Sequence, residues 1–474
     1  MLAHTSVELT NNPSTATVAN RMIRRFRIVV PPKTNWFSPN FLEIASAAPT
    51  VLLDFSFIKF IEIGFTFSIA FLSSGIIGIN LKSRGRQAMG GQPQDSPESS
   101  RSASSHSSPA MLREIYEQPQ ALRETIRRNG EGKNIFAAEA QSIDGGFSGV
   151  SKIIIAASGS SRNAGLAGEI MMEDLAGVAV DVEYSSEYCL RSSHADADSL
   201  VVLITQSGET ADTIAAQREA LRRRAKTVAI SNVVESTIAR ESSASLITYA
   251  APECAVPATK SFTAQLAILY LFALFLAQKR GRIDLEAVNN YLEQLARMPV
   301  KIERELSAWD SQAGKVARFV QNAKALLYLG RGVHYAIARE GALKLEEVSY
   351  VQAEGMPTGE LRHGPNALLD EKLVVVALAT QDSSDSDSEI RYRKTLDVLE
   401  YVKSCRGRVI AIATEGDTKV PKIADRVIFV PAAPELLLPI LEVVPLQLLA
   451  YHFAALNGCD VDHPRHLVKA VVRE

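Results

Sequence analysis

Cysteine is scarce in this sequence. Cys189, Cys254, Cys405 and Cys459 are its four cysteines in 474 residues. No two of them lie close together along the chain, and no histidine lies beside them at metal-ligand spacing. This argues against a disulfide framework and against a zinc site. The pattern suits a cytoplasmic protein kept in a reducing environment, and we expect neither a metal nor a cofactor.

The chain also lacks an excess of charge of either sign. It has 51 Lys and Arg residues against 53 Asp and Glu residues, a net charge of -2. Such a balance gives no case for nucleic-acid binding. The apolar fraction of 46% is that of an ordinary globular protein.

Residues 1–110 differ in composition from the rest. The run Ile63 to Leu81 contains no charged residue and is just long enough to cross a bilayer as a helix, although polar residues and glycines interrupt it. Residues 90–110 are rich in Ser and Pro and are typical of a linker. Three interpretations stay open: a membrane anchor, which is not favoured; a targeting or accessory segment; and a non-functional extension upstream of Met89 or Met111. We expect no catalytic residue here.

From Met111 onward, short β-rich runs alternate with helical patterns. Each run is continuously apolar and is followed by Gly or Ser, which is typical of parallel strands buried on both faces. The predicted strands are Lys152 to Ala157, Leu200 to Ile204, Thr227 to Ile230 and Leu246 to Tyr249. A second series, about 173 residues later, comprises Leu326 to Leu329, Val374 to Thr380 and Val409 to Ala413.

A period this long predicts an α/β protein with two tandem doubly wound parallel sheets. We place the first domain at residues 111–295 and the second, with its C-terminal tail, at 296–474. A helical connection from Phe262 to Phe319 joins them. Its apolar stretch, Leu266 to Ala277, is too short to span a membrane and predicts a buried helix.

Two loops of the first repeat contain hydroxyl side chains where a strand ends and a helix begins. They are Ser158 to Ser161 and Thr205 to Thr210. Helix N-termini at the carboxyl ends of parallel strands bind anions. The loops lack a Walker lysine and a G-x-G-x-x-G pattern, which favours a small phosphate monoester over a nucleotide. The alternative is that these residues are only helix caps. The corresponding loop of the second repeat, Gln381 to Asp385, is acidic and is expected to repel phosphate.

The second repeat contains the more reactive side chains. Glu340, Lys344 and Glu347 fall on one stripe of a predicted helix, flanked by apolar residues. Such a stripe indicates either a cleft or a solvated salt-bridge ladder. His363 lies in a Gly- and Pro-containing loop, and Lys469 lies near the C-terminus in a tail that must dock to be ordered.

Residues 111–474 resemble the isomerase half of glucosamine-6-phosphate synthase (glutamine-fructose-6-phosphate aminotransferase), a pair of SIS (sugar isomerase) domains. The strings that carry the resemblance are spread over the whole segment: EIYEQP, TQSGETADT, ATKSFTAQL, EGALKLEEVSY, GELRHGP, VPLQLLAYH and DVDHPRHLVK.

The resemblance implies an enzyme that converts fructose 6-phosphate to glucosamine 6-phosphate. It implies that Lys469 forms a Schiff base with the substrate, that His363 assists ring opening, and that Glu347 moves a proton with Lys344 beside it. It also implies a homodimer in which the histidine enters the neighbouring site. The residues that it implies for substrate binding are Ser160, Ser161, Thr205, Gln206, Ser207, Thr210, Val256 and Ala258.

The sequence departs from the family in one large respect. Family members begin with a glutaminase domain whose N-terminal cysteine releases ammonia, and residues 1–110 contain no cysteine. We therefore expect ammonia to come from a separate glutaminase subunit or from solution. Smaller departures are Ser160 for Thr, Thr205 for Ser and Ala258 for Ser. Alternative functions are an amino-sugar-phosphate deaminase or deglycase, and a non-catalytic sugar-phosphate sensor.

Overall fold

A computed structural model describes residues 108–130, 135–136, 150–191 and 195–473, together with the backbone of three strands nearer the N-terminus. The chain divides into two compact units, Met1–Ser104 and Ser105–Glu474.

The first unit contains three short strands, β1 (Glu43–Ala45), β2 (Phe65–Phe71) and β3 (Ile76–Ser83), in the order β1-β3-β2. Strands β2 and β3 pair antiparallel. The charge-free run from Ile63 to Leu81 therefore contains β2 and most of β3, not the single helix that its sequence alone suggested. The segment before Asn40 and residues 90–107 lie outside the described residues.

The second unit contains two five-stranded sheets, and every pair of neighbouring strands in them is parallel. The first has the order β5-β4-β6-β7-β8, and the second has the order β10-β9-β11-β12-β13. The two orders correspond strand for strand, which confirms the predicted repeat. The strands are β4 (Lys152–Ala157), β5 (Ala179–Tyr184), β6 (Ser199–Ile204), β7 (Lys226–Ser231), β8 (Ala244–Ile247), β9 (Ala325–Gly330), β10 (Gln352–Pro357), β11 (Val374–Ala379), β12 (Arg408–Thr414) and β13 (Arg426–Val430).

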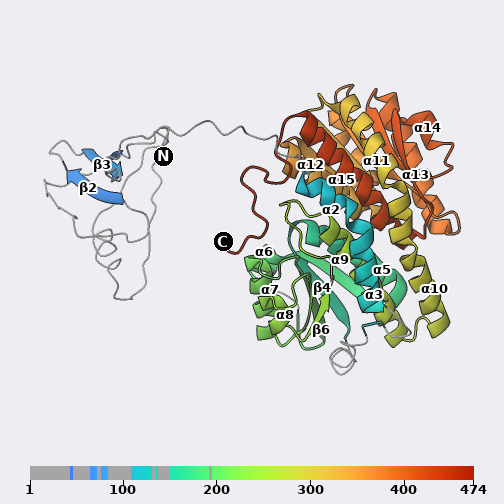
Figure 1. Ribbon diagram of the computed structural model, residues 1–474, viewed down its shortest axis with the longest axis horizontal. Helices are drawn as coiled ribbons and strands as arrows, with labels where there is room; N and C mark the ends of the chain where they lie inside the picture. The colour runs from blue at the N-terminus through green and yellow to red at the C-terminus, as the bar shows by residue number, and fades with distance from the viewer. Residues whose placement is uncertain are drawn as a thin grey trace, which may run out of the picture. The chain divides into compact units, whose positions relative to one another are not determined.

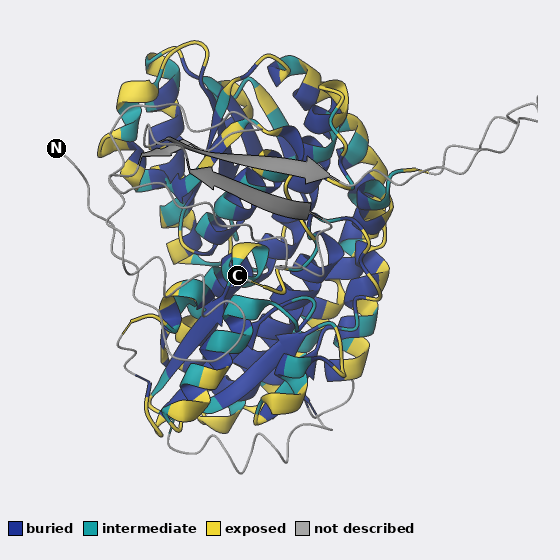
Figure 2. Cartoon of the chain, turned by 90° about the vertical axis from the view of Figure 1, so that its left-hand side faces the viewer, coloured by how far each residue is buried: buried dark blue, intermediate teal, exposed yellow. Residues whose placement is uncertain are grey.

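The central strands were predictable because both of their faces are buried. All six residues of β6 and of β11 are buried (Figure 2). Strands β5 and β10 were missed because, at a sheet edge, they alternate buried with exposed residues. The prediction for β8 was wrong at its end. The strand stops at Ile247, and Tyr249 has a φ of 50°, which removes it from extended geometry.

Helices surround both sheets and join them into one body. They are α2 (Ala110–Tyr116), α3 (Gln118–Gly130), α5 (Gly159–Ala176), α6 (Ser185–Tyr188), α7 (Ala211–Arg222), α8 (Thr237–Glu241), α9 (Lys260–Lys279), α10 (Leu285–Ala296), α11 (Met298–Val320), α12 (Val333–Ser349), α13 (Ser386–Ser404), α14 (Val420–Ile423) and α15 (Leu438–Leu456), with 3-10 helices η1 (Thr358–Arg362), η2 (Pro365–Leu368) and η3 (Glu435–Leu437). Helix α5 of the first repeat packs on α12 of the second. One hydrophobic core includes side chains from both sheets.

Two stretches of the described chain are long and apolar enough to cross a membrane, α9 and Glu435–Leu456. Their apolar stretches are 94% and 83% buried inside the fold. Both therefore serve as core helices, and the prediction of a buried helix around Leu266 to Ala277 is confirmed. The four cysteines, all of them among the described residues, form no disulfide bond.

The tail after α15 leaves the second repeat and returns to the first. The Asp462 carbonyl accepts from the Val256 N–H, and the Val471 carbonyl accepts from the Ala211 N–H at the start of α7, both at 2.9 Å. The Asp462 carboxylate accepts from the N–H groups of Ala110 and Met111 at 2.8 Å, which caps α2. The tail is thus docked on the first repeat (Figure 1).

Candidate active site

The loop between β6 and α7 holds its hydroxyl groups close together. Thr205 Oγ1 and Thr210 Oγ1 lie 2.9 Å apart, and the Gly208 N–H donates to Thr205 Oγ1 at 3.3 Å. Gly208 has a φ of 71°, and a Cβ at this position would lie 2.1 Å from Ser236 Oγ. Only glycine therefore permits this turn.

The alternative that these hydroxyl residues serve only as helix caps fails at both helix starts. Thr210 is the N-cap of α7 and Ser158 is the N-cap of α5, but neither side chain makes a capping hydrogen bond. Ser207 does stabilise the turn, because its Oγ accepts from the Glu209 N–H at 3.1 Å. Thr205 and Thr210 bond to each other instead, at 2.9 Å between their Oγ1 atoms.

The helix α12 buries its charged stripe against the first repeat. Glu340 and Lys344 are 0% and 1% exposed, whereas Glu347 is 21% exposed. Lys344 Nζ lies 3.6 Å from Glu340 Oε1 and forms an ion pair with Glu347. The stripe is therefore not a solvated ladder, and only its Glu347 end reaches solvent.

Contacts from α5 fix the Glu340 end of this stripe. Asn163 Nδ2 donates to Glu340 Oε2 at 2.9 Å, and Ser160 also hydrogen-bonds this carboxylate. Burial raises the pKa of Glu340, and Lys344 and the two hydrogen bonds only partly offset that effect. Burial would lower the pKa of Lys344, but Glu347 and Glu340 outweigh it and raise that pKa.

Lys469 reaches the same region from the docked tail. Its Nζ lies 2.5 Å from Glu253 Oε2, and the Glu253 carboxylate is 0% exposed. Thr259 N–H, Ser261 N–H and Ser261 Oγ also donate to Glu253, at 2.9, 3.1 and 2.7 Å. Burial would raise the pKa of Glu253, but Lys469 and these donors outweigh it and hold the pKa below its ordinary value.

The pair of Lys469 and Glu253 lies within electrostatic range of the α12 stripe, because Glu253 contributes to the raised pKa of Lys344. The remaining predicted residues border them. Ser161 Oγ accepts from Gln265 Nε2 at 3.0 Å, and Val256 and Ala258 are half-buried between Glu253 and α9. A cavity of about 620 Å³ adjoins the site, with Gln206, Asn232 and Glu253 among its lining residues.

His363 does not join this group. It is exposed at the end of η1, so part of its predicted loop is 3-10 helix. Its N–H donates to the Glu360 carbonyl at 2.9 Å. Among the described residues, no contact links its side chain to Lys469 or Glu347.

Sequence reasoning missed Glu253, Asn163 and Gln265. A signal for Glu253 existed. The string Ala-Ala-Pro-Glu occurs at residues 250–253 and again at 432–435, with at most two residues between it and the end of the last strand of each sheet. Asn163 and Gln265 have no such signal, because only packing brings them to Glu340 and Ser161.

Comparison with known proteins places this architecture in a family. Residues 147–275 and 319–457 each match the family model of the SIS domain. These two segments make up more than half of the chain, and they correspond to the two sheets with their helices. The chain belongs to the SIS domain family.

Within that family, the chain is similar to one kind of enzyme. It is 43% identical over 367 residues to the glutamine–fructose-6-phosphate aminotransferase [isomerizing] of Chlorobaculum tepidum, covering 77% of this chain and 58% of that protein. The enzyme of the same name from Thermus thermophilus is 41% identical over 369 residues, again 77% of this chain and 59% of that protein. The chain thus spans less than two thirds of these relatives.

Solved structures agree with this placement. The C-terminal domain of glucosamine-fructose-6-phosphate aminotransferase from Francisella tularensis matches with a TM-score of 0.70 and 33% identity. The match covers 76% of this chain and all of that domain. A glucosamine-6-phosphate deaminase from Thermotoga maritima, at 23% identity and a TM-score of 0.58, shares the fold.

Proposed function

We propose that this chain is a sugar-phosphate aminoisomerase that converts fructose 6-phosphate and ammonia into glucosamine 6-phosphate and water. The observation that carries the proposal is the position of Lys469. A lysine from the C-terminal tail lies 2.5 Å from a fully buried carboxylate, in electrostatic range of the charged helix α12. The similarity to the isomerase part of the named aminotransferases supports the same activity.

The phosphate of the substrate would lie on the loop between β6 and α7. Thr205, Gln206, Ser207 and Thr210 offer hydroxyl and amide groups there, next to the positive end of the α7 dipole. The sugar chain would then extend past Ser160 and Ser161 on one side and Val256 and Ala258 on the other.

The amine of Lys469 would attack the C2 carbonyl of open-chain fructose 6-phosphate and expel water to form an imine. Glu253 supports this step as a positioning residue, because its carboxylate fixes the amine at the site. Ammonia would then displace Lys469 from C2, which leaves a substrate imine and restores the free lysine.

Glu347 would complete the conversion by moving one proton. Its carboxylate would remove a proton from C1, giving an enaminol, and a proton returned to C2 would leave a C1 aldehyde and a C2 amine. Glu347 suits this role because it is the partly exposed end of the α12 stripe. Lys344 holds its carboxylate in place from the buried side.

The scheme implies two partners, a second copy of this chain and a source of ammonia. Ring opening needs an acid-base group, and His363 is too far out on the surface to serve its own chain, so it would act in the neighbouring subunit of a homodimer. Ammonia would come from a separate glutaminase subunit or from solution.

Trapping of the imine tests the proposal directly. Incubation of the protein with radiolabelled fructose 6-phosphate and borohydride should attach label to Lys469, and peptide mapping should locate it there. Lys469→Arg should abolish the labelling because a guanidinium does not form the imine. Label on another lysine, or conversion to glucosamine 6-phosphate that survives in Lys469→Arg, would contradict the assignment.

A further inference from the structure

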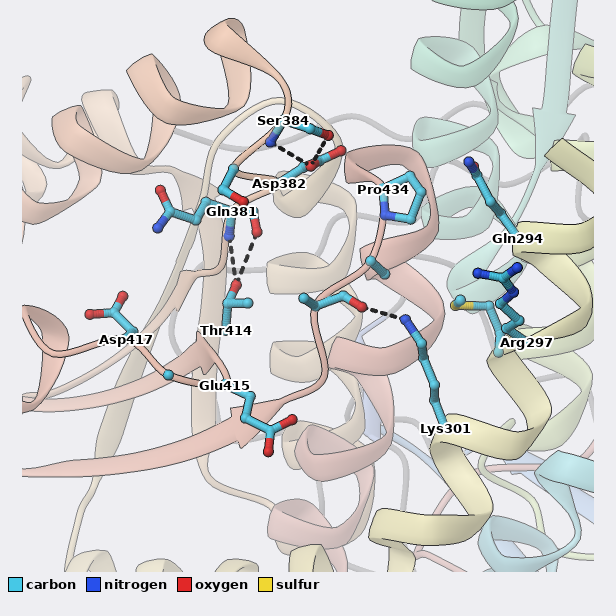
Figure 3. A pocket seen from close by; sticks show the side chains of 15 residues that line it. Gln294, Arg297, Lys301, Gln381, Asp382, Ser384, Thr414, Glu415, Asp417 and Pro434 are labelled. Atoms are coloured by element: carbon cyan, nitrogen blue, oxygen red, sulfur yellow. Dashed lines mark hydrogen bonds between the residues drawn. The ribbon is translucent and has the colours of Figure 1, made fainter. Parts of the chain in front are cut away.

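The second repeat contains a cavity of about 480 Å³ at the carboxyl ends of β11, β12 and β13. Its residues are distinct from those of the site around Lys469. One wall consists of Gln381 and Asp382 after β11 and Thr414 and Glu415 at the end of β12. The opposite wall lies at the start of helix α11. It contains Arg297, which precedes the helix, and Lys301 within it, with Gln294 of α10 beside them (Figure 3).

The cavity is the counterpart of the one beside Lys469. That cavity lies between α3, through Glu124 and Arg128, and the ends of β6, β7 and β8, through Gln206, Asn232 and Ala251. Among the described elements, helices α3 and α11 each precede the first strand of their sheet in chain order. Arg297 and Lys301 follow Glu124 and Arg128 by the repeat spacing of about 173 residues. The second cavity therefore has two cations where the first has one acid and one base.

Among the described residues, the cations of this cavity have no strong acidic partner. Arg297 reaches Glu293 only at 4.0 Å, with both side chains about 70% exposed, and Lys301 donates to the Ala432 carbonyl. Burial, together with the neighbouring charges of Arg297 and Arg304, lowers the pKa of Lys301. Cations held this close repel one another, and a bound anion would relieve that repulsion.

The carboxylates on the opposite wall are engaged by groups of their own. Asp417 accepts from Tyr392 OH at 2.6 Å and from the N–H of Lys419 at 2.7 Å. Asp382 Oδ1 accepts from Ser384 N–H and Oγ, at 2.9 and 2.6 Å, and Glu415 lies 3.5 Å from Arg304. The acidic loop alone predicts repulsion of phosphate, and these contacts and the facing cations offset part of that repulsion.

Polar groups beside the cations suit a polyhydroxyl compound. The Gln294 Oε1 atom is buried without a hydrogen-bond partner among the described residues. The Gln381 side chain lines the opposite wall. The volume lies in the range of small-molecule sites. We propose that this cavity is a second sugar-phosphate site, in which Arg297 and Lys301 bind the phosphate and Gln294 and Gln381 bind hydroxyl groups.

The site is testable with glucitol 6-phosphate, an open-chain sugar phosphate without a carbonyl, which can neither form an imine nor be isomerised. Calorimetric titration of the full chain should show two equivalents bound. Arg297→Gln combined with Lys301→Gln should weaken one equivalent at least about tenfold, because two charge-assisted hydrogen bonds are lost. Thr205→Val should weaken the other equivalent. Inorganic phosphate should compete for both.

A matched control is Lys315→Gln combined with Arg318→Gln, which removes the same charge from exposed positions of α11 away from the cavity. Binding of a single equivalent that only Thr205→Val weakens would overturn the second site. Equal loss in the cavity variant and the control would also overturn it, because it would reflect general charge attraction. Circular dichroism checks that each variant is folded. If Thr205→Val left the binding of glucitol 6-phosphate unchanged, that result would contradict the proposed function and not the second site.

Discussion

At the scale of single residues, the site depends on carboxylates that hold lysines. The Glu253 side chain is 0% exposed, and its described contacts include five hydrogen bonds, of which only that from Lys469 comes from a cation. Removing the partner of a buried charge leaves the remaining group without compensation, so such a pair tolerates little change.

Glu253→Gln should therefore lower imine trapping at Lys469 by about tenfold, because an amide cannot replace the charge-assisted bond. Trapped label per chain measures this. Glu253→Asp should restore part of the yield if charge is what matters, and Glu303→Gln, an exposed substitution, should change nothing. Equal labelling in Glu253→Gln and the unmodified protein would remove its positioning role.

Glu347→Gln should reduce the turnover of fructose 6-phosphate by about 10² to 10⁴-fold, the usual contribution of a general base. Imine trapping should persist, because Glu347 acts after the imine has formed. Steady-state kinetics and trapping on the same preparation separate the two steps. Turnover that is undiminished would assign the proton transfer to another group.

At the scale of elements, the loop between β6 and α7 is set by one glycine. Gly208→Ala adds a methyl group against Ser236 at a positive φ, and it should cost roughly 2 kcal/mol or more of unfolding free energy and weaken sugar-phosphate binding. Denaturant titration and calorimetry measure the two effects.

Gly281→Ala is the matched control for that change. Gly281 has a φ of 68° and open space around its Cβ position, so substitution there should cost only about 1 kcal/mol for the conformation. If both variants lose the same stability and Gly208→Ala keeps its ligand affinity, the contact with Ser236 does not shape the loop.

At the scale of the whole molecule, stability depends on a buried charge network in the second repeat. His334 Nδ1 lies 2.8 Å from Glu442 Oε1, and its Nε2 lies 3.1 Å from Glu435 Oε1. Burial alone would lower the pKa of His334, but the two carboxylates outweigh it and raise that pKa to about 10. The imidazolium joins α12 to η3 and α15.

This raised pKa predicts a pH dependence of defined sign. The charged form is favoured by folding, so its contribution is complete below the ordinary histidine pKa of 6.5 and is lost as pH rises toward 10. The difference in unfolding free energy between the unmodified protein and His334→Gln should shrink from pH 6 to pH 10. Urea titrations at both pH values measure it, with exposed His463→Gln as the control. A difference that does not change with pH would contradict the network.

Much of the fold follows from sequence because parallel strands buried on both faces are continuously apolar. Continuous apolar runs predict β4, β6, β11 and β12, and the repeat of these runs predicts two similar sheets. Edge strands such as β5 escape the same reasoning, because one side of each contacts solvent and polar residues are tolerated there.

The candidate site divides in the same way. Local sequence identified the hydroxyl loop at Thr205, the stripe of Glu340, Lys344 and Glu347, and Lys469, because each lies in a distinctive string. The contacts of those residues could not be predicted from local sequence. Asn163 meets Glu340 only because α5 packs on α12, and Arg297 and Lys301 face an acidic loop only because α11 packs beside β13.

The sequence by itself determined the kind of protein, two parallel sheets with loops suited to a sugar phosphate, because hydrophobic periodicity and short motifs are local properties. The tertiary structure decided which charges are buried and which partners they have. Lys469 and Glu253 are 216 residues apart along the chain and 2.5 Å apart in space. Burial and long-range pairing set the protonation states of such groups and the atoms that they contact. No single stretch of sequence determines the burial or the pairing.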